Sequence, residues 1–488
     1  MKILMVASEV SPYVKTGGLA DMVAALSTSL SASGHDVRIV IPRYYRIDRK
    51  RLQAIPGVLV CHIGEAEYYT QVFEQNIPSS KTIVYFIDYE QYFGREGIYG
   101  DEKTSDFPDN PARYSLLSHA ALQICLKQAW MPDIIHLHDW QASLLSSLIK
   151  CSNQYPQFKT VKTVLSIHNI GYQGIYSKEY FHCTGLDWNV YYASGLEDRD
   201  CINFLKSGIV CSDKITTVSP TYAKQIKTQE YSFGLDGILK DRERDVSGIL
   251  NGIDTDIWNP QTDALITSKF SKSSIEKKIV NKKTLQEKMS LEISEDTPII
   301  GMVTRLSEQK GIAELFAPNY GCAYSVASNM KVQFAIIGEG EAWCENELLS
   351  LSRQLPNFRV FIGYDETLSH LLQAGSDFFL MPSRYEPCGL SQMYAMRYGT
   401  IPIVRRTGGL SDTVENYNET TGEGTGFMFD NLSPSSIYDT IGWACFAYYN
   451  KKTHITKMRT RCMEANFSVA FSASKYLELY KSIIDYYC

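Results

Sequence analysis

The 488-residue sequence has no long uncharged apolar run, no CxxC pair and no excess of basic residues. No apolar stretch approaches the ~20 residues that a helix needs to cross a bilayer, which argues against a membrane-spanning protein. The charged residues, 48 basic and 54 acidic, give a net charge of −6. Because nucleic-acid-binding surfaces are usually basic, general affinity for nucleic acids is not expected.

The cysteines have neither the spacing of a metal site nor a context that favours disulfides. There are 12 of them in a long chain without a recognisable signal peptide. The opening MKILMVASEV has one Lys and a short apolar run that meets Glu9. It predicts a first β-strand rather than a secretory or transit segment. We therefore expect a reduced, cytoplasmic protein with no metal site.

What the sequence does contain is a series of short apolar runs bounded by polar turns. Many are apolar at consecutive positions, which is typical of strands buried on both faces of a parallel sheet. Helical patterns such as LADMVAALSTSLSASG at 19–34 lie between them. The alternation predicts a doubly wound α/β fold, and the length predicts more than one domain. The runs are KILMVAS, DVRIVIP, TIVYFID, DIIHLHD, TVLSIHN, KITTVS, PIIGMVTR, VQFAIIG, RVFIGY, FFLMP and IPIVRR.

An internal repeat predicts two related halves. TGGLADMV at 16–23 returns as TGGLSDTV at 407–414 with six of eight positions identical, and each copy opens a helical pattern after an apolar run. A cluster of Gly, Asn, Asp and Pro in SGILNGIDTDIWNP marks the expected border. We predict Rossmann-like domains at 1–246 and 247–469, the second opening with a solvated, Lys-rich helix within 268–289. The last helical pattern, SASKYLELYKSIIDYY, could pack on either half.

Most of the unusual polar residues follow the apolar runs directly. In open α/β sheets, ligands bind at the carboxyl edge of the strands. Because these residues come from both halves, we expect a site in a cleft between two domains. They are Lys15, Gly17 and Gly18; His138, Asp139 and Trp140; His168 and Asn169; Arg305 and Lys310; Tyr364; and Arg384 and Glu386.

The stretch CGLSQMYAMRYG reads as the start of a helix that binds phosphate. Free N–H groups and the helix dipole attract anions at such an end, and Gly389 allows close approach of the backbone. Arg305 and Lys310 supply cations, and the guanidinium group matches the geometry of phosphate oxygens. The Gly17–Gly18 turn can approach the same group. The sequence therefore predicts a diphosphate pocket.

Several candidates also have a purely structural interpretation. Glu386 could be a carboxylate stabilised by a helix dipole, and taken alone this is the favoured interpretation. His138 and His168 could be hydrogen-bonded core residues. GEGEAW at 338–343 lacks the third Gly of a dinucleotide fingerprint, because Trp343 occupies its place. What favours function is that the candidates all converge on one sheet edge.

Seven motifs closely resemble those of bacterial glycogen synthases and plant starch synthases, in the family's order. They are KTGGLADMV, HDWQASL, SIHNIGYQG, ILNGIDTDIWNP, TRLSEQKG, PSRYEPCGLSQMYAMRYGT and RRTGGLSDTV. The resemblance implies a GT-B fold, with two Rossmann-like domains around a deep cleft and a final helix, at about 470–488, that returns to the first domain. It implies retaining transfer of glucose from ADP-glucose to the non-reducing end of an α-1,4-glucan, with no cofactor or metal.

The resemblance also assigns roles to individual residues. Lys15 contacts the sugar nucleotide, and Arg305 and Lys310 bind the diphosphate. His168 lies beside the glucose, and Glu386 is the key carboxylate of the family. We count the last four of these residues as catalytic.

Further residues are implied to bind substrate. Asn251 and Tyr364 border the nucleotide, and Asp139 with Trp140 lines the acceptor side. The remaining substrate-binding candidates are Gly17, Gly18, Asp21, Asn169, Cys388, Gly389, Leu390 and Ser391. The family pattern is broken at 313–329, where a more regular amphipathic helix is usual; this affects the expected helix geometry rather than the site.

The chemistry of the residues fits such a transfer. Fixed cations and N–H dipoles favour the negative charge that develops on the departing diphosphate. A double displacement needs a second carboxylate. Related transferases with an E-x7-E pattern would carry it at position 394, where this chain has Tyr394. Our hypothesis is therefore a front-face mechanism, in which Glu386 steadies the sugar and domain closure excludes water.

Three alternatives remain at this point. A UDP-sugar-dependent transferase of the same fold differs in only a few base contacts. A catalytically silent glucan-binding protein would leave the phosphate-binding residues unexplained. A nicotinamide oxidoreductase is the least favoured, because the dinucleotide fingerprint fails.

Overall fold

The computed structural model describes residues 1–101 and 106–484 and divides into two compact units. The N-terminal unit comprises residues 1–252 and the segment that starts at Val469; the C-terminal unit comprises Ile253–Ser468. Sequence analysis places the border after residue 246, and in the structure the division falls after Gly252. Residues 485–488 of the expected last helix lie outside the described part of the chain.

A ten-stranded sheet forms the centre of the N-terminal unit. Its strands are β1 (Lys2–Val6), β2 (Asp36–Pro42), β3 (Gln53–Ala54), β4 (Leu59–Ile63), β5 (Ala66–Asn76), β6 (Ile83–Asp88), β7 (Ile134–His138), β8 (Lys162–Ile167), β12 (Lys214–Thr217) and β13 (Val246–Gly248). The order is β13-β12-β8-β7-β1-β2-β6-β5-β3, with β4 paired to β5. The strands from β13 to β6 are parallel, and the pairings of β5 with β6, β3 and β4 are antiparallel. The carboxyl ends of β8, β7 and β1 are therefore neighbours.

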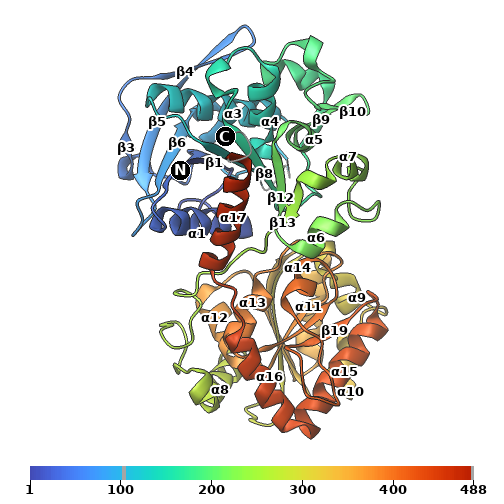
Figure 1. Cartoon of the computed structure of the whole chain (residues 1–488). Coiled ribbons are helices and arrows are strands. Elements are labelled where there is room, and N and C mark those ends of the chain that lie inside the picture. Colours follow the sequence, from blue (N-terminus) through green and yellow to red (C-terminus); the bar gives the residue numbers. More distant parts are fainter. Residues whose placement is uncertain (102–105, 485–488) are drawn as a thin grey trace. The chain divides into compact units, whose positions relative to one another are not determined.

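A small antiparallel sheet and eight helices complete the N-terminal unit over the described residues. The small sheet contains β9 (Ile175–Ser177), β10 (Glu197–Asp198) and β11 (Cys201–Asn203). The helices are α1 (Gly18–Ala32), α2 (Glu90–Phe93), α3 (Asn110–Lys127), α4 (Asp139–Cys151), α5 (Phe204–Cys211), α6 (Pro220–Gln225), α7 (Asp236–Asp241) and α17 (Val469–Ile484). Figure 1 shows α17, in red, beside the blue α1. The hydroxyl of Tyr480 on α17 lies 2.8 Å from Nδ1 of His136 on β7, so the last helix packs on this unit.

The C-terminal unit is built on a parallel six-stranded sheet covered by helices (Figure 1). Its strands are β14 (Ile299–Leu306), β15 (Gln333–Gly340), β16 (Phe358–Ile362), β17 (Phe378–Met381), β18 (Ile401–Arg405) and β19 (Phe427–Phe429), in the order β16-β15-β14-β17-β18-β19. The helices are α8 (Lys278–Lys288), α9 (Ile312–Phe316), α10 (Ala323–Asn329), α11 (Ala342–Gln354), α12 (Glu366–Gly375), α13 (Ser391–Arg397), α14 (Gly408–Thr413), α15 (Pro434–Asn450) and α16 (Lys452–Glu464). The ends of β14, β17 and β18 are adjacent.

The Lys-rich segment corrects one prediction. The helix expected within 268–289 exists as α8, but it is solvated on one face only: Lys278 and Lys282 are 4% and 3% exposed, whereas Glu287 and Lys288 are exposed. Nζ of Lys278 donates to the hydroxyl of Thr400 at 2.7 Å, and Nζ of Lys282 lies 2.9 Å from a carboxylate oxygen of Asp377. The carboxylate of Asp377 offsets the cost of removing the charge of Lys282 from water. The partners of Lys278 within the described residues are neutral oxygens, and burial lowers its pKa well below the usual value. No local pattern reveals these partners.

All eleven apolar runs form parallel strands of the two large sheets. The strands that the sequence does not predict are β3, β4, β5, the three of the small sheet, β13 and β19, which are mostly short or polar. At 313–329 the chain forms the two short helices α9 and α10 instead of one regular helix. Pro318 and Gly321 lie between them, and neither residue favours a continuous helix.

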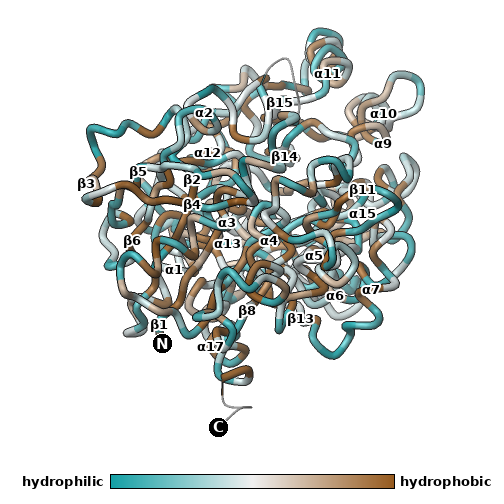
Figure 2. The backbone as a smooth tube through the Cα atoms, turned by 90° about the horizontal axis from the view of Figure 1, so that it is seen from above, coloured by the Kyte–Doolittle hydropathy of each residue, from teal (hydrophilic) through white to brown (hydrophobic). Residues whose placement is uncertain are grey.

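Hydropathy follows this architecture. Figure 2 shows brown, hydrophobic tube along many interior strands and helices and teal segments in many outer loops. The side chains of the two sheets that face helices are buried, for example Leu4 and Ile135 in one unit and Ile336 and Phe379 in the other. Over the residues described, no helix combines the length and apolar character that a bilayer crossing would require.

Candidate active site

In the C-terminal unit, two loops after neighbouring strands are tied together. We call them the Lys310 loop (307–311), after β14, and the Glu386 loop (382–390), after β17. The N–H of Arg384 donates to the carbonyl oxygen of Gln309 at 2.8 Å. The side-chain amide of Gln309 donates to the carbonyl oxygen of Tyr385 at 3.3 Å. These hydrogen bonds fix the positions of the two loops relative to each other.

The carboxylate of Glu386 is buried and ion-paired. Nζ of Lys310 lies 2.6 Å from Oε2 of Glu386, and the hydroxyl of Ser383 donates to the same oxygen at 2.9 Å. Glu386 is 5% exposed. A charge-assisted bond of this kind stabilises the ionised carboxylate, so Glu386 is not an ordinary surface carboxylate at a helix end.

Two glycines allow the loops to pack this closely. Gly311 has a φ of +70°, and a Cβ there would lie 2.0 Å from the carbonyl oxygen of Pro382. A Cβ on Gly409 would lie 2.0 Å from the carbonyl oxygen of Cys388, and the N–H of Gly409 donates to the carbonyl oxygen of Glu386 at 3.0 Å. Larger residues would push the loops apart. The second copy of the TGGL repeat thus supports the Glu386 loop from the end of β18.

Arg384 pairs with acidic residues at the same junction. Its Nη2 donates to Oε1 of Glu314 on α9 at 2.8 Å, and its Nε lies 3.7 Å from a carboxylate oxygen of Glu308. The two opposite charges at the mouth of β17 therefore have separate ion-pair partners, and all three partners lie in or directly after the Lys310 loop.

Other predicted residues of this unit also lie at or after strand ends. Arg305, at the end of β14, is exposed, and its guanidinium group has no hydrogen bond or ion pair with the part of the chain that the structure describes. Tyr364 follows β16 and is 63% exposed. Gly389, with a φ of +73°, and Leu390 lead into α13, which begins at Ser391. The first-turn N–H groups and a cation are thus available to an anion.

In the N-terminal unit, the loop after β1 is organised by Glu9. This residue is 2% exposed. One carboxylate oxygen accepts from the hydroxyls of Thr16 and Tyr99 at 2.7 and 2.6 Å, and the other accepts from the N–H of Thr16 at 2.5 Å. Next to this anchor, Nζ of Lys15 lies 2.6 Å from Oδ2 of Asp21, and Lys15 remains half exposed. Glu9 therefore fixes the backbone that carries Lys15.

The ends of β7 and β8 bring His138, Asp139 and His168 together. Nδ1 of His138 lies 3.1 Å from Nε2 of His168. The N–H of His168 donates to Oδ1 of Asp139 at 2.7 Å, and Asp139 has a φ of +58°. The ring of His138 packs on that of His136, with centroids 4.2 Å apart. Of these residues, His138 is fully buried and His168 is partly exposed.

Burial dominates the protonation of this group. It lowers the pKa of His168 to about 3 and that of His136 to about 3, and it lowers the pKa of His138 well below its usual value. Burial raises the pKa of Asp139 to about 7, although the N–H group of His168 acts in the other direction. At neutral pH the imidazoles are therefore neutral, and the ring of His168 offers hydrogen bonds rather than a charge.

Three further predicted residues are Trp140, Asn251 and Asn169. Trp140 is 5% exposed and packs edge-on against Tyr114 with centroids 5.0 Å apart. A Cβ on Gly174 would lie 2.3 Å from its ring. Asn251 is 5% exposed, and its Oδ1 has no hydrogen-bond partner within the described residues. Asn169 accepts a hydrogen bond from the N–H group two residues on.

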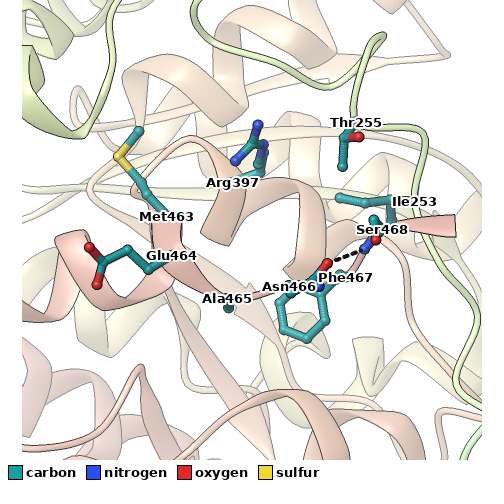
Figure 3. Close-up of a pocket in the computed structure, with 9 residues that line it drawn as sticks. All are labelled: Ile253, Thr255, Arg397, Met463, Glu464, Ala465, Asn466, Phe467 and Ser468. Carbon is teal, nitrogen blue, oxygen red and sulfur yellow. Dashed lines mark hydrogen bonds between the residues drawn. The ribbon is translucent and has the colours of Figure 1, made fainter. Parts of the chain in front are cut away.

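The C-terminal unit also contains a pocket that the sequence does not predict (Figure 3). Its volume is about 290 Å³. Nε of Arg397 is buried there without a hydrogen-bond partner among the residues described. The lining residues are Ile253, Thr255, Arg397, Met463, Glu464, Ala465, Asn466, Phe467 and Ser468. None of them is a predicted site residue, so this pocket is separate from the groups described above.

Comparison with known proteins identifies the family of this chain. The chain is 57% identical to a glycogen synthase of Treponema denticola over 485 residues, covering 99% of both chains. It is 40% identical to glycogen synthase 1 of Geobacter metallireducens, covering 98% of this chain and 95% of that one. The chain belongs to the glycogen synthase family.

Family models and solved structures agree with this membership. The family model of the starch synthase catalytic domain matches residues 2–241 of this glycogen synthase family member, and that of glycosyl transferases group 1 matches residues 284–448. The catalytic domain of starch synthase IV from Arabidopsis thaliana, bound to ADP and acarbose, superposes with a TM-score of 0.89 at 32% identity and 99% coverage of both chains. Sucrose-phosphate synthase from Thermosynechococcus elongatus shares the fold, with a TM-score of 0.60 at 16% identity and 99% coverage of both chains. The fold is GT-B, as the sequence predicts.

Sequence reasoning missed several residues that shape the site in this family member. Glu9 binds Thr16 and so fixes the backbone next to Lys15, and the hydroxyl of Ser383 donates to Glu386. Gly409 allows the chain to pass close to the carbonyl oxygen of Cys388. An acidic residue directly after a buried strand is a usable signal for Glu9. No local signal identifies the hydroxyl of Ser383 as a partner of Glu386.

Proposed function

We propose that this chain transfers glucose from ADP-glucose to the non-reducing end of an α-1,4-glucan, with retention of configuration. The observation that carries the proposal is the Lys310–Glu386 ion pair after strands β14 and β17, with the exposed Arg305 at the end of β14, in a chain with full-length similarity to glycogen synthases. The related starch synthase IV is bound to ADP and acarbose, which supports an adenine nucleotide and a glucan-like acceptor.

The C-terminal group suits a departing diphosphate. Arg305 lies at the end of β14, Lys310 follows that strand, and the first turn of α13 lies at the end of the Glu386 loop. Cations and fixed N–H dipoles stabilise the charge that develops on phosphate oxygens as the glucosyl bond breaks. An anion at this position would also give the guanidinium group of Arg305 a partner, which it lacks among the residues that the structure describes.

In this proposal Glu386 acts on the sugar by charge and by hydrogen bonds to its hydroxyls. A covalent glucosyl-enzyme formed by double displacement would need a second carboxylate. Position 394 holds Tyr394, whose ring stacks on Trp258 with centroids 3.8 Å apart. This stacking supports a packing role there and favours attack of the acceptor on the side that the diphosphate leaves.

The N-terminal group would contact the sugar and the acceptor. A Cβ on Gly17 would meet nothing within 4 Å, so local packing does not require glycine, and the open space suits a ligand. Lys15 is two residues before Gly17 in the sequence. The neutral ring of His168 would accept or donate a hydrogen bond to a glucose hydroxyl, with Asp139 holding its backbone. Trp140 and Asn251 keep the acceptor and nucleotide roles that the resemblance assigns.

The finer assignments belong to the same proposal. The N-terminal unit would serve the acceptor and the C-terminal unit the sugar nucleotide. The donor would be the only small molecule required besides the glucan, and the enzyme would act in the cytoplasm.

A donor panel tests the reaction. The purified chain is incubated with glycogen and radiolabelled ADP-glucose or UDP-glucose, and incorporation into glucan is measured. We expect ADP-glucose to be preferred. Preference for UDP-glucose would overturn the donor assignment, and no incorporation from either donor would favour a silent glucan-binding protein.

A further inference from the structure

We infer that Arg384 and Glu314 form a clamp that positions Lys310 and Glu386 for the reaction; the inference rests on the proposed function. Nη2 of Arg384 lies 2.8 Å from Oε1 of Glu314. Arg384 is two residues before Glu386 in the Glu386 loop. Glu314 is four residues after Lys310, on α9. The clamp therefore links the two chain segments whose ends carry the reactive ion pair.

The clamp is anchored by a buried carboxylate. Glu314 is 6% exposed, and its second oxygen, Oε2, has no hydrogen-bond partner within the residues described. A buried carboxylate left without a cation is strongly disfavoured. Arg384 is thus held to Glu314 by the cost of separating them, although its own side chain is 44% exposed.

The backbone of Arg384, in the Glu386 loop, is hydrogen-bonded to the Lys310 loop and to the end of β18. Its N–H donates to the carbonyl oxygen of Gln309, the neighbour of Lys310, at 2.8 Å. Its carbonyl oxygen accepts a hydrogen bond from the guanidinium group of Arg405, at the end of β18. A shift of Arg384 would therefore move the Lys310 loop and the Glu386 loop relative to each other. Since Nζ of Lys310 lies 2.6 Å from Glu386, a small shift breaks that contact.

A different explanation makes a distinct prediction. If the exposed part of Arg384 instead touched the donor directly, its loss would weaken ADP binding whether or not Glu314 and Lys310 were present. If Arg384 acts through the ion pair, Glu314→Gln must impair turnover in the same way, although Glu314 is buried. The effect of Arg384→Gln must also shrink once Lys310 is gone.

The test is a set of double-mutant cycles with the full chain. The variants are Glu314→Gln, Arg384→Gln, Lys310→Met and the two double variants that combine Arg384→Gln with each of the others. We expect Glu314→Gln to lower kcat about tenfold and to change the ADP dissociation constant less than about threefold. We expect Arg384→Gln to cost less than about threefold in kcat in the Lys310→Met background.

The control is Arg406→Gln, which removes an arginine of similar exposure whose carboxylate partner, Asp430, is exposed rather than buried. Nε of Arg406 lies 2.8 Å from Asp430, and the Arg406 side chain is 48% exposed; its kcat should stay near that of the parent. Arg384→Lys is the second variant if Arg384→Gln is poorly folded, and it should recover part of kcat. Glu314→Gln within twofold of the parent kcat, or losses that multiply in the Lys310→Met background, would overturn the clamp. If the unmodified chain transfers no glucose, the proposed function fails first, so the two failures can be told apart.

Discussion

Nζ of Lys310 and Oε2 of Glu386 lie 2.6 Å apart at the ends of two neighbouring parallel strands. They are separated by 75 intervening residues, and only the sheet order β14-β17 brings them together. A cation that would meet a diphosphate thus also holds the carboxylate that would face the sugar. Under the proposed function, this pairing would couple donor binding to the position of the carboxylate.

Removing the charge of Glu386 should separate turnover from binding. Glu386→Gln keeps the size of the side chain and removes the carboxylate, so we expect kcat to fall about 100-fold or more while ADP affinity changes little. Turnover is measured with labelled donor and affinity by calorimetry. Glu366→Gln, an exposed residue of the first turn of α12, is the control. Near-normal turnover of Glu386→Gln would remove this residue from its role.

Loss of Arg305 should weaken nucleotide binding. A hydrogen bond to a charged group contributes about 1.5–3 kcal/mol, so we expect Arg305→Gln to raise the ADP dissociation constant about tenfold or more. Arg353→Gln, an exposed arginine on α11, should leave affinity unchanged. Equal affinities for the two variants would place the diphosphate elsewhere.

Glu9 should matter through the loop that it anchors. In Glu9→Gln, the amide would present a donor to groups that need an acceptor, namely the N–H and hydroxyl of Thr16 and the hydroxyl of Tyr99. We expect the donor KM to rise about tenfold, in line with the loss of a buried charge-assisted bond. The exposed Glu65 gives the matched control Glu65→Gln. An unchanged KM would mean that Glu9 only stabilises the fold.

His119 should make the stability of the N-terminal unit depend on pH. Burial lowers its pKa to about 4, and its ring nitrogens contact the hydroxyl of Tyr155 and the carbonyl oxygen of Thr184. Because the unfolded chain binds this proton more tightly, stability should be full above about pH 6.5 and fall as the pH drops towards 4, by about 1.4 kcal/mol per pH unit.

The contribution of His119 is measured by comparing a variant with the parent chain, because several groups contribute to the pH dependence of stability. Asp139 has a raised pKa and acts in the opposite direction between pH 4 and 7, whereas His136 and His168 add to the slope. Thermal unfolding of His119→Asn and of the parent chain between pH 4.5 and 7 therefore isolates one group. We expect the variant to show the weaker pH dependence; parallel curves would contradict the buried neutral state of His119.

Parallel strands were predictable because each is apolar at consecutive positions. Runs such as those that form β7 and β14 are buried on both faces, and this pattern is visible locally. The antiparallel β5 and the small sheet were not predictable, since their polar residues face solvent or other loops. The burial of one face of the Lys-rich α8 is not predictable, because the buried partners of Lys278 and Lys282 lie about 90 or more residues away in the sequence.

The residue types of the candidate site and their place at the carboxyl edge of the sheet were predictable from the sequence. The contacts between these residues were not. The positions of Lys310 and Glu386 after strands indicated the carboxyl edge. Their direct pairing, the support from Ser383 and the contact of Gly409 with the Glu386 loop depend on which strands are neighbours. Strand order is a long-range property that apolar periodicity does not encode.

The sequence by itself determined the fold class, the family motifs and the chemical groups available at the strand ends. These are set by local hydrophobic patterning and by side-chain chemistry, which can be read residue by residue. Only the tertiary structure decided that Lys310 faces Glu386, that Arg384 faces Glu314 and that Glu9 anchors Thr16. Those pairings arise when distant segments are brought within hydrogen-bond distance, where burial and the loss of water make each charge dependent on its partner.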